Sequence, residues 1–477
     1  MSDLTQQSAV DQLRALSGRE VSARELAELH LEVIAADPGF NAVITVDPAA
    51  VRAEADAADS QRARGGELPL LGLPVVVKDS LETRGLRTTC GLPELADHIP
   101  DRDADAVALL RRAGAIILGK ANVPPNCQDI QTSNTLFGTT PNPHDRLRTA
   151  GGSSGGPAAA VAAGHAPLAL GSDLAGSARL PGHYCGVHAL RPSHGIVPTR
   201  GHIPRPPGWA TSSDMLTLAP FARTAADLDL ALDVLAAPSP RDATAWRLRL
   251  PPARHDELRH YRIGWWPDDP FCAVDSETRQ LLHQVEQLLR KAGARLDAAT
   301  RPVDLATSNT LFTTLMFATA SATAPEDAFA AECAQADTLA TDDRSPYAAF
   351  LRGRTSRHRS WLLAHEQRTQ LRDVWSTYFE THDVLITPVA PTAAVEDQTG
   401  VPPMERHILV DGRRRPYYDQ TTWTNLAGHV HLPSATVPMG RTRDGLPMGV
   451  QIIGPYLEDR TVTRVAALLA EAGGQDR

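Results

Sequence analysis

Long apolar runs are absent from this chain of 477 residues. No stretch approaches the roughly 18 consecutive apolar residues that a membrane-spanning helix needs, so we expect no membrane span. The N-terminal sequence MSDLTQQSAV is polar and lacks the basic start and apolar segment of a secretory signal. We therefore expect a cytoplasmic protein that does not act at a membrane.

The chain also lacks an excess of positive charge, and its cysteines are few. The formal net charge is −9, and the short arginine tract at 413–415 does not offset it, which argues against direct nucleic-acid binding. The five cysteines are scattered and never spaced as C-x-x-C. This pattern is typical of reduced thiols and not of a disulfide framework or a zinc site. We expect neither a metal nor a cofactor.

Of the 47 basic residues only three are lysines, namely Lys78, Lys120 and Lys291. Lys78 directly follows the apolar, strand-like run Val75–Val77. A lysine buried there can lose its proton, whereas arginine cannot, so a lysine kept in such a setting can serve where arginine cannot. Taken alone, such a run more often ends in a lysine that reaches solvent.

Helical and strand-like patterns alternate along most of the chain. Residues 103–112 predict a helix, and residues 115–119 predict a strand directly after it. Such alternation predicts an α/β fold in which helices cover a largely buried sheet. Further strands are expected at 262–266, 384–387 and 449–453, with a further helix from about Ser276 to Gly293.

The strongest local signal is the segment 149–157, TAGGSSGGP. It matches neither the P-loop G-x-x-x-x-G-K-[ST] nor the dinucleotide fingerprint G-x-G-x-x-G. It also lacks the G-x-S-x-G spacing of a nucleophile elbow. By itself the segment predicts a flexible loop that enters a helix at 157–163, where the proline suits the first turn.

Three segments together, 72–79, 149–157 and 171–181, resemble the amidase-signature family, whose Ser–cis-Ser–Lys triad lies in such motifs at this spacing. Other segments are similar to the family as well: 114–122, 135–143, 425–428 and 445–455. The resemblance covers most of the chain and is densest from 70 to 200. It implies an α/β fold with a large mixed, mostly parallel twisted sheet covered by helices on both faces.

The resemblance also implies a set of catalytic residues. Ser177 is expected to be the nucleophile, Ser153 to relay protons and Lys78 to be the general base, with a cis peptide bond between Gly152 and Ser153. Backbone N–H groups are expected to stabilise the oxyanion. These groups belong to Leu174, Ala175, Gly176 and Ser177.

The chain departs from the family pattern near these residues. Ala175 stands where the family usually has glycine, and if that position needs a positive φ, alanine is strained there. His183 is expected near the active site, as a substrate contact or as a packing residue. His429 and His431 alternate on one strand face, but without a third ligand in clear spacing no metal site is expected. The candidates for the substrate pocket are Phe137, His183, Trp209 and Trp423.

No low-complexity linker or repeat divides the chain, so a single domain is expected over 1–477. Residues 1–60 are expected to form a helical lead-in, 65–235 the catalytic core and about 301–415 a variable region that lines the substrate.

Three functions remain open. The leading one is hydrolysis of a small-molecule amide through an acyl-serine. The second is a glutaminase subunit that passes ammonia to a partner, as in transamidation of glutamyl-tRNA. The third is a specialised acyl-transfer protein or an inactive homologue. A homodimer is an expectation by family analogy alone.

Overall fold

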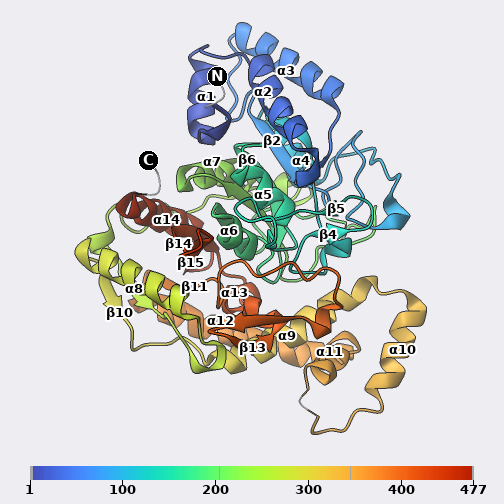
Figure 1. Cartoon of the computed structure of the whole chain (residues 1–477), viewed down its shortest axis with the longest axis vertical. Coiled ribbons are helices and arrows are strands. Elements are labelled where there is room, and N and C mark those ends of the chain that lie inside the picture. Colours follow the sequence, from blue (N-terminus) through green and yellow to red (C-terminus); the bar gives the residue numbers. More distant parts are fainter. Residues whose placement is uncertain (1–3, 204, 344, 475–477) are drawn as a thin grey trace.

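The computed structural model describes residues 4–203, 205–343 and 345–474 (Figure 1). Eleven of the described strands form one large sheet in the order β1-β3-β2-β6-β8-β7-β14-β15-β11-β9-β10. Their bounds in sheet order are β1 Val43–Thr45, β3 Ile116–Ala121, β2 Pro74–Lys78, β6 Leu168–Asp173, β8 Thr217–Ala222, β7 His188–Arg191, β14 Ser434–Arg441, β15 Pro447–Ile453, β11 Val384–Pro388, β9 Arg262–Trp265 and β10 Arg295–Asp297. Two short hairpins lie outside the sheet: β4 Ser133–Asn134 with β5 Gly138–Thr139, and β12 His407–Val410 with β13 Arg413–Pro416.

The large sheet is mixed, as expected, but it is not mostly parallel. Parallel pairing joins β2 to β3 and β6, and joins β9 to β10 and β11. The other described neighbours are antiparallel. The connections along the chain explain part of this arrangement. A short turn joins β14 to β15 and permits only antiparallel pairing. The segments that join β2 to β3 and β9 to β10 contain helices, and such longer connections allow parallel pairing. The alternation of helical and strand-like patterns predicted where strands occur, but not whether neighbouring strands pair in parallel or antiparallel.

Helices cover both faces of the sheet, as expected. On β2, Val75 and Val77 belong to one apolar core, and Val76 belongs to another on the opposite face. The first core includes residues of α4 Asp105–Arg112, α7 Ala225–Leu235, α8 Ser276–Lys291 and α14 Asp459–Gly473. The second includes residues of α2 Ala23–Ala36, α3 Pro48–Ala63, α5 Gly155–Ala162 and α6 Arg179–Cys185.

The remaining helices lie near the start of the chain and between the strands of its second half. The expected lead-in contains α1 Ala9–Ser17 together with α2 and α3, and it also contributes β1 to the sheet edge. The later helices are α9 Leu305–Ala320, α10 Glu326–Ala336, α11 Pro346–Arg354, α12 His358–Thr381 and α13 Thr422–Gly428. In Figure 1, α10 and α11 lie at the end of the molecule opposite the lead-in. Within the described ranges, no helix is both long and apolar enough to cross a membrane.

Candidate active site

Lys78 is the last residue of β2, and its side chain is completely buried. Its Nζ lies 2.7 Å from Ser153 Oγ, 2.9 Å from Ser154 Oγ and 2.9 Å from Ser172 Oγ. Sequence analysis named Ser153 and missed the other two serines, although both lie inside segments that resemble the family. Three hydroxyl groups therefore hold the amine at the end of the strand.

The surroundings of Lys78 favour its neutral form. Burial lowers the pKa of Lys78, because the ammonium ion loses its hydration. The thiols of Cys127 and Cys90 and the carboxylate of Asp173 act in the opposite direction, but the net effect is a lowered pKa. A neutral amine is the form that can accept a proton from a hydroxyl group.

The Gly-Ser-rich segment is a buried, closely packed turn and not the flexible loop that its composition predicts. Its Gly152–Ser153 peptide bond is cis, as expected. α5 begins within the segment, and a Cβ on Gly156 would lie 2.4 Å from the backbone of Asn122. Glycine is needed at this position because the first turn of the helix lies directly against neighbouring backbone.

Ser177 lies in the turn between β6 and α6, and the carboxylate of Asp173 shapes that turn. This carboxylate accepts hydrogen bonds from the N–H groups of Gly176 over 3.0 Å and Ala178 over 3.1 Å. The Ser154 N–H donates to the Ser177 carbonyl oxygen over 3.1 Å, which joins the turn to the other serine segment. Ser177 is half-buried, whereas Gly176 and Ala178 on either side are buried.

The structure corrects the expectation of strain at Ala175. Gly176 has the positive φ, at +90°, and Ala175 does not. A Cβ on Gly176 would lie 2.2 Å from Thr424 Oγ1, so the neighbouring helix also requires glycine there. The Gly176 N–H is already bonded to Asp173, which makes it a poor candidate for the oxyanion hole. The candidate donors that make no hydrogen bond within the described part of the chain are the N–H groups of Leu174, Ala175 and Ser177.

Two buried arginines hold Asp173 in place, a feature that sequence analysis missed. Arg179 Nη2 lies 2.8 Å from Asp173 Oδ1, Arg191 Nη1 lies 3.2 Å from it, and all three side chains are completely buried. Burial alone would raise the pKa of Asp173, but the arginine charges outweigh it and lower the pKa, so the carboxylate stays ionised. Arg179 also donates to Gln451 Oε1 over 2.7 Å, which ties the turn to β15.

Two of the four pocket candidates, His183 and Trp423, lie in the protein interior, where His183 has the packing role that was its alternative. His183 is completely buried, its Nδ1 accepts the Gly449 N–H over 2.9 Å, and its Nε2 lies 3.2 Å from the Thr392 carbonyl oxygen. Trp423 is completely buried and donates to the Cys272 carbonyl oxygen over 3.0 Å. Both side chains have all their polar atoms bonded to protein and present none to a substrate.

The other two candidates lie nearer the surface. The guanidinium of Arg87 lies 5.0 Å from the ring centre of half-buried Phe137, and Trp209 is 45% exposed. Their place in a pocket stays a prediction. The apolar neighbours of Leu174 and Ala175 are mainly residues of α9 and α12, and both helices lie within the region 301–415 that was expected to line the substrate. This apolar cluster consists of Met215, Phe312, Leu315 and Ala364, with the partly buried Leu311, Met316 and Trp361.

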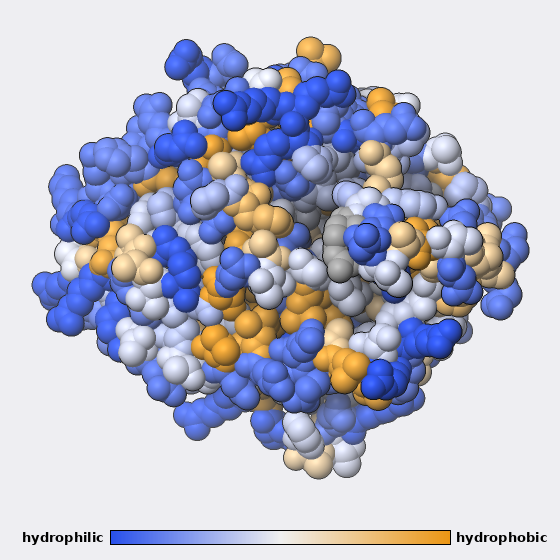
Figure 2. Space-filling view, turned by 90° about the horizontal axis from the view of Figure 1, so that it is seen from below, coloured by the Kyte–Doolittle hydropathy of each residue, from blue (hydrophilic) through white to orange (hydrophobic). Residues whose placement is uncertain are grey.

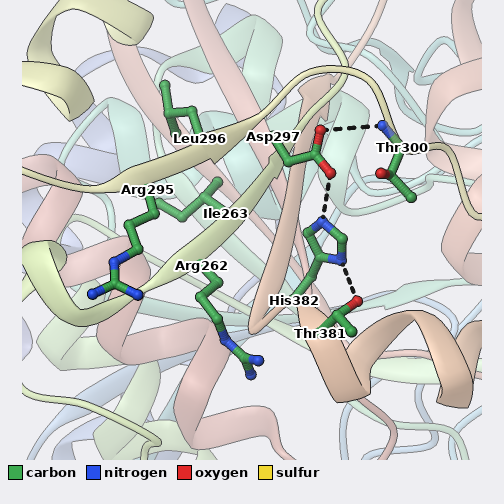
Figure 3. Close-up of a pocket in the computed structure, with 8 residues that line it drawn as sticks. All are labelled: Arg262, Ile263, Arg295, Leu296, Asp297, Thr300, Thr381 and His382. Carbon is green, nitrogen blue, oxygen red and sulfur yellow. Dashed lines mark hydrogen bonds and ion pairs between the residues drawn. The ribbon is translucent and has the colours of Figure 1, made fainter.

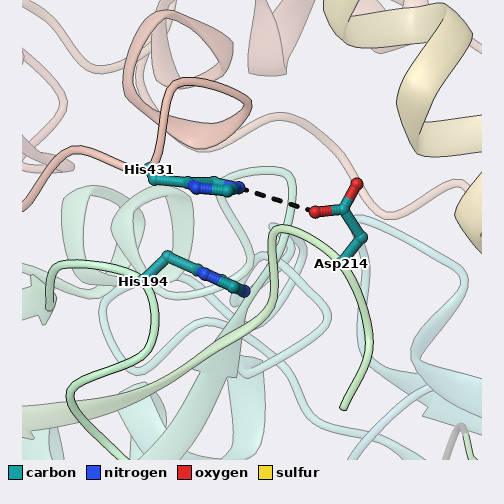
Figure 4. Close-up of side chains that lie close together, drawn as sticks. All are labelled: His194, Asp214 and His431. Carbon is teal, nitrogen blue, oxygen red and sulfur yellow. Dashed lines mark ion pairs between the residues drawn. The ribbon is translucent and has the colours of Figure 1, made fainter. Parts of the chain in front are cut away.

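His431 belongs to a polar cluster that the sequence did not reveal (Figure 4). Its ring is stacked on that of His194 with centroids 4.2 Å apart, and its Nε2 lies 3.5 Å from Asp214 Oδ1. One potential ligand atom from each of these three residues lies within 4.8 Å of the others, so further metal-ligating groups do accompany His431. Arg368 lies 2.7 Å from Asp214 Oδ2, however, and its charge already compensates this carboxylate.

A pocket of about 400 Å³ lies elsewhere, between β9, β10 and the end of α12 (Figure 3). Two of its lining residues, Asp297 and His382, form a 3.1 Å contact. The candidate catalytic residues do not line this pocket, so we do not assign the chemistry to it.

Comparison with known proteins agrees with the geometry around Lys78. The family model described as Amidase matches residues 25–463, and the chain belongs to this family. Similar curated proteins include a glutamyl-tRNA(Gln) amidotransferase subunit of Acidothermus cellulolyticus, with 34% identity over 99% of this chain and 95% of that protein. The corresponding subunit of Roseiflexus castenholzii is 35% identical over 96% of this chain and 94% of that protein.

Solved structures show the same fold. One similar structure is an inhibitor-bound vestigial protein complex that reveals the evolutionary origins of an s-triazine catabolic enzyme. A chain of this complex has a TM-score of 0.82 and 29% identity, and the match covers 98% of this chain and 99% of that one. The 6-aminohexanoate cyclic dimer hydrolase has a TM-score of 0.79 and 26% identity, covering 98% and 97%. A bacterial aryl acylamidase of the amidase-signature family has a TM-score of 0.80 and 25% identity, covering 98% and 96%.

We expect Asp173→Asn to lower the free energy of unfolding by about 3–5 kcal/mol, because two buried guanidinium groups lose their counter-charge. Urea unfolding followed by circular dichroism measures the change. The more exposed pair of Arg460 and Asp233 provides a control, and Asp233→Asn should cost about 1 kcal/mol or less. Equal losses in the two variants would contradict the structural role of Asp173.

Proposed function

We propose that the protein hydrolyses the C–N bond of an amide through an acyl ester on Ser177. The observation that carries the proposal is a completely buried Lys78 whose Nζ lies 2.7 Å from Ser153 Oγ, within hydrogen-bond distance. The hydrogen bond from the Ser154 N–H to the Ser177 carbonyl oxygen supports it, because it holds the two serine segments together. Membership of the amidase family agrees with this chemistry.

In the proposed reaction, neutral Lys78 accepts a proton from Ser153 while Ser153 accepts one from Ser177. Ser177 Oγ attacks the amide carbonyl carbon, and backbone N–H groups of the preceding loop stabilise the negative charge that develops on oxygen. The proton then passes through Ser153 to the leaving nitrogen. Water hydrolyses the acyl ester with the same groups acting as base and acid. Ser154 and Ser172 keep the amine in place during both proton transfers.

Apolar side chains beside the candidate oxyanion loop support an amide with an apolar acyl group as substrate. Leu174 and Ala175 pack against the apolar cluster that contains Phe312 and Leu315. Phe312 and Leu315 are themselves buried, whereas the face of the molecule shown in Figure 2 has other apolar residues near its middle with hydrophilic residues around them. Transfer of apolar surface from water into such surroundings is worth about 25 cal/mol per Å², so an alkyl or aryl acyl group would gain affinity there.

Release of ammonia from glutamine is a second candidate function. The amidotransferase relatives favour it, since they match almost the whole chain. In that case the chain would act with a partner protein, and its net charge of −9 would leave any contact with tRNA to that partner.

We expect Ser177→Ala to abolish labelling by a fluorophosphonate probe, which phosphorylates a nucleophilic serine oxygen. Lys78→Arg should slow labelling by about 10²–10⁴-fold, because a guanidinium group cannot accept the proton. In-gel fluorescence and intact-mass spectrometry follow the reaction. Ser60→Ala and Lys291→Arg alter exposed residues of the same types and should leave the rate unchanged. Full labelling of the Ser177 variant would refute the acyl-serine mechanism.

The labelling rate should increase with pH, since only unprotonated Lys78 can act as the base. Because burial lowers the pKa of Lys78, the midpoint of the increase should lie below the ordinary lysine value of about 10.4. Stopped reactions over a pH series measure this midpoint. A midpoint at or above the ordinary value would mean that the amine is not the group that titrates.

We expect amides of longer apolar acids to be better substrates than glutamine. Phe312→Ala should lower kcat/KM for a hexanoyl anilide by about 5–100-fold, the cost of about 1–3 kcal/mol of apolar burial, and affect an acetyl anilide less. Leu363→Ala, at an exposed position of α12, is the control. Circular dichroism verifies that both variants fold. Faster release of ammonia from glutamine than hydrolysis of any apolar amide would favour the glutaminase instead.

A further inference from the structure

Two thiols that the proposed reaction does not use lie next to the candidate active site. The Sγ atoms of Cys90 and Cys127 are 3.8 Å apart. Cys90 is completely buried, whereas Cys127, at the end of a single 3-10 turn, is partly exposed. Cys127 is therefore the more exposed residue of the pair, and Cys90 is the buried one.

Backbone hydrogen bonds hold the two cysteines against each other. The Asn126 N–H donates to the Cys90 carbonyl oxygen over 3.0 Å, and the Cys90 N–H donates to the Asp79 carbonyl oxygen over 2.9 Å. Cys90 and Cys127 have φ values of +52° and +57°, which residues with a Cβ seldom adopt. The surrounding structure thus fixes an uncommon backbone conformation at both positions, and it does so directly beside Lys78.

The charges around the pair make its two thiols unequal. Burial raises the pKa of the Cys90 thiol. Burial acts in the same direction on Cys127, but the hydrogen bond with Cys90 and the positive charge of Lys78 outweigh it and lower the pKa of this thiol. The partly exposed member of the pair is therefore the one that ionises first, and the thiolate is the reactive form. By contrast, burial raises the pKa of Cys272 to about 11.

We propose that Cys127 is a modification site for small organic disulfides and that its modification ends in a Cys90–Cys127 disulfide beside Lys78. The proposal rests on the short distance between the sulfur atoms and on the partial exposure of the residue Cys127 beside the completely buried Cys90. It goes beyond the proposed hydrolysis, because neither thiol takes part in that reaction.

The chemistry requires two exchange steps. The Cys127 thiolate attacks one sulfur of a disulfide RSSR, forming Cys127–S–S–R and releasing RS⁻. Cys90 then loses its proton and attacks the Cys127 sulfur, which forms the protein disulfide and releases a second RS⁻. Both leaving groups take up protons as RSH, so the two cysteines are oxidised and one RSSR is reduced to two RSH. The two sulfur atoms must approach from 3.8 Å to about 2.05 Å.

Such a bond would act on the candidate active site through two contacts. The Cys90 N–H is bonded to the carbonyl oxygen of Asp79, the residue after Lys78. Closing the gap between the two sulfur atoms would pull on this backbone and displace Lys78, and we infer a loss of activity from this displacement. The disulfide also removes the negative charge of the Cys127 thiolate, which by itself would favour neutral Lys78 and so oppose the loss. The inferred loss rests on the proposed function, whereas formation of the disulfide does not.

The test treats the reduced, full-length protein with 2-hydroxyethyl disulfide at neutral pH and blocks the remaining thiols with iodoacetamide under denaturing conditions. Peptide mass spectrometry should find Cys90 joined to Cys127. Fluorophosphonate labelling, measured on the same samples, should fall and should return after dithiothreitol.

Three variants separate the two steps. Cys90→Ser should stop at a mixed disulfide on Cys127, and Cys127→Ser should leave Cys90 reduced. Cys333→Ser removes another partly exposed thiol, far along the chain on α10, and should form the same disulfide as the unaltered protein. Absence of the Cys90–Cys127 peptide pair in the unaltered protein, or reaction at Cys333 alone, would overturn the proposal. If the disulfide forms while labelling is unchanged, the modification site stands and its effect on Lys78 is refuted.

Discussion

A buried carboxylate at the end of one strand organises the candidate active site. Asp173 lies at the carboxyl end of β6 and binds the N–H groups of the turn that carries Ser177. Its charge is acceptable in the interior only because Arg179 and Arg191 lie within ion-pair distance. Through Arg179 the same carboxylate is linked to Gln451 on β15, so the turn is tied to a second strand of the sheet. The geometry at Ser177 therefore depends on charges that never meet a substrate.

The parallel pairing of β2 with β6 brings the two halves of the site together. Lys78 ends β2 and Asp173 ends β6, and the carboxyl ends of neighbouring parallel strands lie at the same edge of a sheet. Ser172, one residue before the end of β6, can thus reach the Lys78 amine. The apolar strand that buries this lysine also shifts its pKa in the direction that a base requires. Strand β2 therefore determines both the position of the Lys78 amine and its protonation state.

Short-range patterns predicted much of this molecule. Alternating apolar residues located strands such as β3 and helices such as α8, and three motifs in register pointed to Lys78, Ser153 and the cis bond before it. Contacts between segments that are distant in the sequence determine the rest, and periodicity does not encode them. They set the direction of each strand, the residues that face a substrate and the partners of buried charges. His183 and Trp423 look like pocket residues in sequence because aromatic rings serve equally well in a core, and only their partners at Gly449 and Cys272 distinguish the two.

The helices α9 to α12 occupy one connection between β10 and β11. The side chains that pack beside the candidate oxyanion loop come mainly from this connection, whereas the proposed nucleophile, relay serine and base come from segments before residue 180. In the proposed mechanism, selectivity and reactivity thus depend on separate stretches of the polypeptide. Mutations in the connection that contains α9 to α12 can then change the class of substrate while the proposed proton-transfer residues stay the same. New specificities can thus evolve on this fold without a change in its chemistry.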